Sequence, residues 1–168
     1  ESFMSGEECR TIADYQNKTI RLDFVNEFGF GESFKEVAAK NTVVEFRKGD
    51  KPDGEVILTK DNIQTAQCQY NEDFAPIEYS IGIILDEKGT EKFAELSREL
   101  AGTDTPLSLW INGEMIFSAN FTTEIKEGNI NIAGVFSQNE AQIIAAQLYM
   151  EDLPFPVEIT NCEFTESK

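Results

Sequence analysis

The spacing of apolar residues between positions 79 and 111 changes twice, from every second residue to every third or fourth and back again. Alternation in 79–85 and in 107–111 is typical of strands with one buried face. The recurrence of Phe93, Leu96 and Leu100 between them is typical of a helix with one buried face. A strand, a helix and a strand in succession predict a domain that mixes helices with sheet strands.

Two further signals extend this order toward the C-terminus. The pair Asn112-Gly113 lies between two apolar segments, and both residues accept the positive φ that a two-residue hairpin turn requires. Ser137 is followed three residues later by Glu140, which is the capping-box pattern at the start of a helix. With strands also expected at 129–132 and 157–159, the order is that of a split β-α-β, ferredoxin-like sandwich. The predicted fold class is therefore α+β.

Weaker signals in the first part of the chain predict a short helix, a strand, a second helix and two more strands, at residues 5–16, 19–24, 33–39, 42–46 and 55–58. We expect two lobes that pack together. Residues 1–76 would form a smaller α/β base, and residues 77–168 a ferredoxin-type head whose last strand returns toward the base.

The balance of charge excludes several classes of function. The chain has 31 acidic and 14 basic residues, a formal charge of −17, and no His. This charge repels phosphate backbones and anionic lipid head groups, so nucleic-acid binding is not expected. The lack of imidazole removes the usual general base near neutral pH and the commonest metal ligand. Cys9, Cys68 and Cys162 form no C-x-x-C motif and permit at most one disulfide.

No motif in the sequence carries recognisable chemistry. Asp50, Asp53 and Glu55 offer oxygen ligands, but their spacing is not that of an EF-hand, and a solvated loop is expected there. Gly29-Phe30-Gly31 lacks the third Gly and the Lys of a phosphate-binding loop. Neither G-x-S-x-G nor S-x-x-K is present to supply a nucleophile. We predict no catalytic, cofactor-binding or metal-binding residue and no cofactor.

A series of short sequence segments, here called phrases, occurs in a fixed order and spans about two thirds of the chain. The phrases lie at residues 41–47, 55–63, 85–96, 110–119, 132–141 and Leu153-Pro154-Phe155-Pro156-Val157. Each phrase alone is weak, because turns and helix caps of this kind serve many α+β proteins. In this order they resemble the first extracytoplasmic domain of the SecD family of protein-export membrane proteins. Leu153-Pro154-Phe155-Pro156 would stop the last helix and extend the chain toward a closing strand.

The resemblance implies a non-catalytic periplasmic or extracellular domain of a bacterial translocase subunit. Its partners would be SecF-like and SecYEG-like translocase components and unfolded preprotein, handled by movement of the head against the base. No apolar run reaches the ~20 residues of a membrane helix, so the membrane helices of such a subunit would lie outside residues 1–168. Because Glu1 is not Met, we expect that an upstream segment precedes it.

Exposed aromatic residues are the natural candidates for gripping a polypeptide, although burial in the core is the alternative for each of them. The candidates are Phe117, Phe121, Phe136 and Phe155, and the substrate-binding residues stay unassigned. Two other classes of function stay open. A free-standing secreted or lipid-anchored binding domain would have the same fold without membrane helices. A hydrolase would need a concave site with a carboxylate of perturbed pKa, and no motif nominates one.

Overall fold

A computed structural model describes residues 10–14, 19–23, 41–71 and 79–150, and the chain divides into two compact units. In the first unit, β1 (Arg10–Asp14) and β2 (Thr19–Asp23) pair as antiparallel strands. The strand predicted at 19–24 is confirmed. The helix predicted at 5–16 is wrong, because β1 completes its backbone hydrogen bonds with β2 and this pairing overrides a sparse helical pattern. The elements predicted at 33–39 and 153–159 lie outside the described residues.

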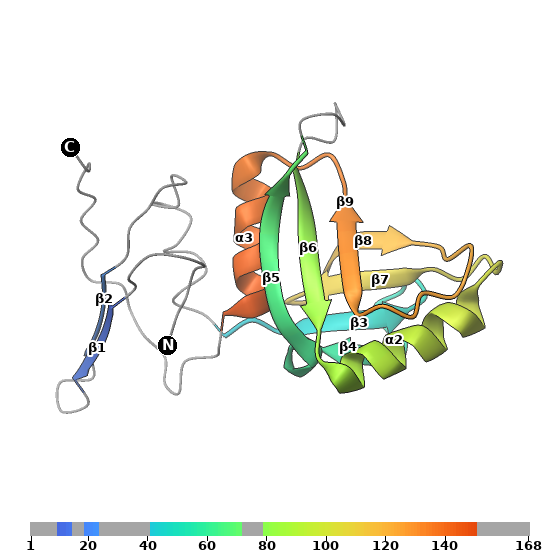
Figure 1. The fold of residues 1–168 in the computed structure, drawn as a ribbon, viewed down its shortest axis with the longest axis horizontal. Coiled ribbons are helices and arrows are strands. Elements are labelled where there is room, and N and C mark those ends of the chain that lie inside the picture. Colours follow the sequence, from blue (N-terminus) through green and yellow to red (C-terminus); the bar gives the residue numbers. More distant parts are fainter. Residues whose placement is uncertain (1–9, 15–18, 24–40, 72–78, 151–168) are drawn as a thin grey trace. The chain divides into compact units, whose positions relative to one another are not determined.

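The second unit, residues 42–151, contains two antiparallel sheets and two α-helices among its described residues (Figure 1). One sheet has the strand order β4-β3-β7-β8 and the other β5-β6-β9. The bounds are β3 Val44–Lys48, β4 Val56–Thr59, a 3-10 turn Lys60–Asn62, β5 Ile63–Tyr70, β6 Tyr79–Leu85, α2 Glu87–Leu100, β7 Leu107–Ile111, β8 Glu114–Ala119, β9 Asn129–Ala133 and α3 Gln138–Tyr149. The α+β class and the order of elements predicted from residue 79 to α3 are confirmed.

The strands on either side of α2 lie in different sheets. In a single ferredoxin-like sheet, β8 would lie beside β6, but here β5 occupies that place. The pairs β6-β9 and β7-β8 are present, and β3 pairs with β7 on its other side. The unit therefore combines strands from both sides of residue 76, and the assignment of residues 1–76 to a base stays a prediction.

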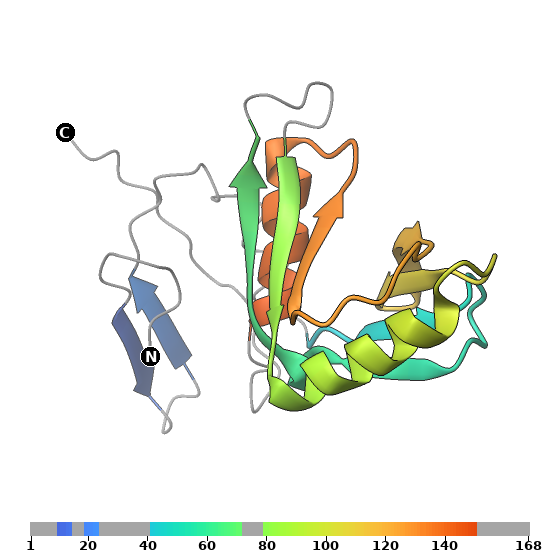
Figure 2. The same cartoon turned by 45° about the vertical axis from the view of Figure 1, so that its right-hand side comes forward.

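Both sheets contribute to one core. Phe46, Leu109 and Ile132 are each at most 2% exposed and belong to the same hydrophobic cluster. Helix α3 packs on β5 and β6, and α2 packs beside β4 at the other end of the unit (Figure 2). Trp110, the single Trp of the chain, is 6% exposed and has the Arg47 guanidinium 5.9 Å from its ring.

Local signals in the sequence define the ends of these elements. Asn112 and Gly113 have φ of 52° and 82°, as the predicted hairpin turn requires. The Asp86 carboxylate accepts a hydrogen bond from Gly89 N–H at 2.6 Å and caps α2. In the capping box of α3, Ser137 N–H donates to the Glu140 carboxylate at 2.8 Å.

The capping box predicts a difference in acid stability. Hydrogen bonds from the Ser137 backbone N–H and then from its hydroxyl lower the pKa of Glu140. The stabilisation is therefore complete above the pKa of an unfolded Glu, about 4.3, and is lost as the pH falls through the lowered pKa of the folded chain. Gln at this position keeps the acceptor but does not titrate. Between about pH 5 and pH 3, Glu140→Gln should lose less thermal stability than the wild type, measured as Tm by circular dichroism.

The exposed Glu114 of β8 provides the matched control. Glu114→Gln removes the same charge without touching a helix cap, so its Tm should follow the pH dependence of the wild type. If Glu140→Gln and Glu114→Gln show the same pH profile, the capping carboxylate does not contribute to acid unfolding.

Candidate functional site

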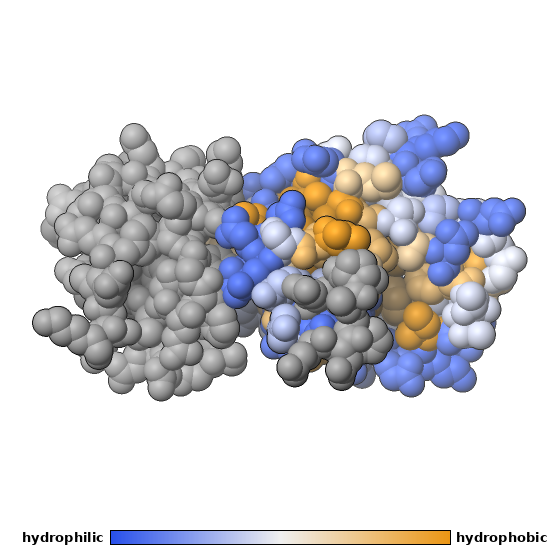
Figure 3. Space-filling view, turned by 90° about the horizontal axis from the view of Figure 1, so that it is seen from above, coloured by the Kyte–Doolittle hydropathy of each residue, from blue (hydrophilic) through white to orange (hydrophobic). Residues whose placement is uncertain are grey.

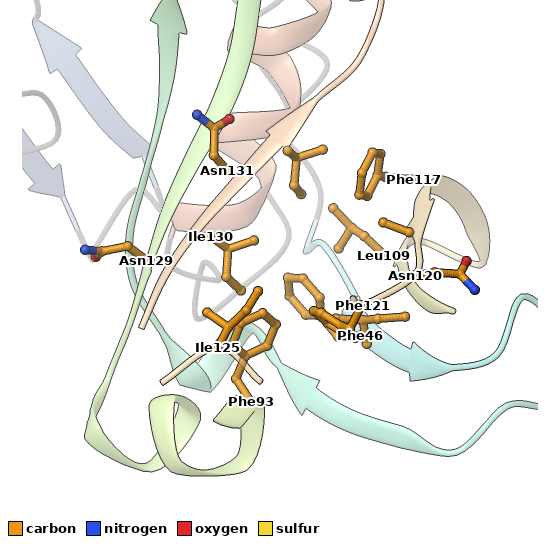
Figure 4. Close-up of a pocket in the computed structure, with 13 residues that line it drawn as sticks. Phe46, Phe93, Leu109, Phe117, Asn120, Phe121, Ile125, Asn129, Ile130 and Asn131 are labelled. Carbon is orange, nitrogen blue, oxygen red and sulfur yellow. The ribbon is translucent and has the colours of Figure 1, made fainter. Parts of the chain in front are cut away.

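An apolar cavity of about 220 Å³ lies between the two sheets (Figure 4). One wall is the inner face of the four-stranded sheet, which presents Phe46, Leu109 and Phe117. The opposite wall is β9, which presents Ile130 and Ile132. The remaining lining residues are Phe93 of α2, Leu107, Ala119, Asn120, Phe121, Ile125, Asn129 and Asn131. None of the lining residues carries a charge.

The cavity has a deep end lined by buried residues and a mouth lined by partly exposed ones. Phe46, Phe93 and Leu109 are 2%, 2% and 1% exposed, so they belong to the core. Phe117 and Phe121 are half-buried and lie where solvent reaches them. Seen from above, apolar residues gather in the middle of the described part with hydrophilic residues around them (Figure 3). The cavity is thus lined by uncharged residues in a chain whose formal charge is −17.

The segment that joins β8 to β9, residues 120–128, forms one side of the cavity and is held against α2. Ile125 N–H donates to Ser97 Oγ at 2.9 Å, and Ser97 Oγ lies 3.2 Å from the Ile125 carbonyl oxygen, which can accept its proton. The Phe121 carbonyl accepts a hydrogen bond from Gly102 N–H at 2.9 Å. The Phe121 ring meets Phe93 edge-on, with 5.6 Å between centroids. These contacts fix Phe121 and Ile125 relative to the helix.

The structure brings together two of the aromatic residues proposed from the sequence. Phe117 and Phe121 both line the cavity, while Phe136 packs half-buried against the core elsewhere. Phe155 lies outside the described residues. Sequence reasoning missed Ile125 and the wall formed by residues 120–128. The available signal was Ser97, a Ser on the apolar face of the predicted helix, one turn after Phe93.

The lining offers burial rather than acid–base or nucleophilic chemistry. Among the residues described, no group of three Cys, Asp or Glu is arranged to hold a metal ion. Cys68 of β5 lies outside the cavity, and partial burial raises the pKa of its thiol, which keeps it protonated near neutral pH. It is the register partner of Ile81 in β6 and packs half-buried against the core. Cys9 and Cys162 lie outside the described residues.

No helix in the described ranges has both the length and the apolar composition that crossing a bilayer requires.

Comparison with known families gives a match over most of the chain. A family model described as "SecDF, P1 head subdomain" matches residues 33–155. Protein translocase subunit SecD of Synechocystis sp. is 31% identical over 109 residues, which cover 62% of this chain and 23% of that protein. Protein translocase subunit SecD of Sebaldella termitidis is 29% identical over 113 residues, which cover 67% of this chain and 27% of that protein. The chain thus spans about a quarter of the length of these relatives.

Two solved structures share the fold. One is described as the structure and function of a membrane component SecDF that enhances protein export. It aligns with a TM-score of 0.62 and 17% identity over 96% of this chain and 86% of that one. The other is SecDF in a super-membrane-facing form, with a TM-score of 0.61 and 20% identity over 74% of this chain and 21% of that one.

The buried hydroxyl of Ser97 predicts a specific loss of stability. Ser97→Ala leaves the backbone N–H of Ile125 without this partner, and an unsatisfied buried polar group costs about 1–3 kcal/mol. We expect a loss of this size in the free energy of unfolding, measured in urea from the fluorescence of Trp110. Ser118→Ala, at an exposed Ser of β8, should change it by less than about 0.5 kcal/mol. Equal losses in the two variants would show that Ser97 does not anchor residues 120–128.

Proposed function

The chain belongs to the SecDF P1 head subdomain family, and we propose that it is the extracytoplasmic domain of a SecD-like subunit that makes transient contact with unfolded preprotein during export. The observation that carries the proposal is the uncharged cavity with half-buried Phe117 and Phe121 at its mouth. The domain acts without catalysis, on the periplasmic or extracellular side of a bacterial membrane.

The size of the cavity suits one large apolar side chain of a passing polypeptide. A dry cavity of about 150 Å³ is enough to bind benzene, so about 220 Å³ accommodates an aromatic or long aliphatic side chain. Burying such a side chain contributes about 1.5–3 kcal/mol. Association costs several kcal/mol of translational and rotational freedom, so a single side chain binds weakly and leaves quickly. Weak binding is what a moving substrate requires.

The charge of the chain favours the same function. At −17 the protein repels anionic lipid head groups and attracts basic segments of an unfolded polypeptide. The membrane-spanning helices, a SecF-like subunit and a SecYEG-like channel would be supplied by the rest of the protein and its complex. Movement of the head relative to a base would then carry the bound segment away from the channel.

Site-specific photocrosslinking tests this contact. Benzoylphenylalanine is introduced in place of Phe117 or Phe121 in the full-length subunit, in membrane vesicles that hold a preprotein arrested during translocation. We expect adducts with the preprotein at both positions, because the probe lies at the mouth of the cavity. The same probe in place of Val56, an exposed residue of β4 that does not line the cavity, should give much less adduct.

Two results would count against the proposal. One is the absence of preprotein adducts at Phe117 and Phe121. The other is an equal yield at Val56, since contact would then be unrelated to the cavity.

A further inference from the structure

Strand β9 lies at the edge of its sheet (Figure 1). Among the strands that the structure describes, β6 is its one partner, and the backbone on its other side is not part of a ladder. A row of unpaired N–H and C=O groups is a template for another strand. Natural edges are usually protected by a charge, a Pro or a bulge, and β9, with the sequence Asn-Ile-Asn-Ile-Ala, has none of these. By contrast β8, an edge of the other sheet, begins with Glu114 and pairs through a register shift.

The hydrogen-bond pattern shows which backbone groups face outward. Leu85 N–H donates to the Gly128 carbonyl at 2.8 Å, so these two residues form a hydrogen-bonded pair of the antiparallel ladder. Such pairs alternate along the ladder, and the next ones are Ile83 with Ile130 and Ile81 with Ile132. The N–H and C=O groups of Asn129, Asn131 and Ala133 therefore point to the free edge.

The two faces beside this edge differ in chemistry. On one face, Ile130 and Ile132 line the apolar cavity. Asn129 and Asn131 also border the cavity, but their side chains point to the other face of the sheet (Figure 4). The Asn131 amide donates to Gln69 Oε1 at 3.4 Å, over the uncharged outer face of the sheet. A strand added at this edge would thus place alternate side chains against apolar and neutral polar surfaces.

We propose that the free edge of β9 binds an extended polypeptide segment as an added strand, with alternating apolar and neutral polar side chains and basic residues at its ends. This inference rests on the proposed function and names the manner of contact with the substrate. Basic ends are favoured because the chain carries a charge of −17 and Glu127 lies just before β9, whereas Glu124 is already paired with Arg98 and Lys126. A second copy of the chain fits less well, since two chains that each carry a charge of −17 repel each other.

A defined peptide tests backbone pairing directly. The probe is a fluorescein-labelled peptide of three Thr-Val repeats with two Lys at each end, titrated with the 168-residue chain and followed by fluorescence anisotropy. Its matched control has the same side chains but an N-methyl group on every second amide, on the edge that would pair with β9. Because several backbone hydrogen bonds are lost, the methylated peptide should bind about tenfold or more weakly.

A variant of the protein tests the same edge from the other side. Asn131→Pro removes an outward N–H and leaves the bonds to β6 in place, a position where edge strands tolerate Pro. Its affinity for the unmethylated peptide should fall roughly three- to tenfold. Asn131→Thr keeps the N–H and should stay within about twofold of the wild type. Trp110 fluorescence checks that each variant is folded, and if Asn131→Pro is not, the two peptides decide the question alone.

Results that differ from these expectations would contradict the inference that β9 binds an added strand. Equal binding of the two peptides, or no effect of Asn131→Pro, would show contact without strand addition and would leave the proposed function standing. If the unmethylated peptide does not bind at millimolar concentration, the edge of β9 is excluded as a polypeptide-binding site. Failure of the crosslinking at Phe117 and Phe121 would instead count against the proposed function itself. If the wild type self-associates in the ultracentrifuge and Asn131→Pro does not, the edge of β9 binds a second copy of the chain instead.

Discussion

Two small sheets in this protein bury their apolar faces in one shared core, and the rest of the structure depends on that packing. Each sheet has an apolar face that must be covered, and the two faces contribute to a single cluster of buried residues. Phe46 and Leu109 from one sheet and Ile132 from the other are almost fully covered where the sheets meet. The same three residues line the deep end of the cavity. The candidate site is therefore the place where the shared core stays incompletely filled.

The sequence predicted best those features that are decided locally. Asn112-Gly113 and the pair of Ser137 with Glu140 mark a turn and a helix start through bonds within a few residues, and both were found as predicted. The distribution of strands between two sheets was not predictable in this way, because any strand with one apolar face could lie beside β6. Likewise β1 exists through its pairing with β2, which its sparse pattern did not indicate.

The candidate site was predictable only in part, because some of its residues are positioned by contacts between distant parts of the chain. Phe117 and Phe121 stand out as aromatic residues near a hairpin, so composition alone nominates them. The position of Ile125 depends on a hydrogen bond to Ser97, 28 residues away in the chain. In the proposed function these residues would bind by burying apolar groups, and burial does not depend on a particular sequence. Binding of this kind suits a family whose members assist export, because exported chains share little beyond being unfolded and partly apolar.

The connection between β8 and β9 also has a mechanical meaning. Residues 120–128 join an edge strand of one sheet to an edge strand of the other, and Ser97 and Gly102 tie them to α2 and to the residues just after it. A force applied along β9 would therefore pass into α2 before it reached β8. Residues 120–128 cannot leave the wall of the cavity without breaking the hydrogen bond between Ile125 and Ser97 of α2.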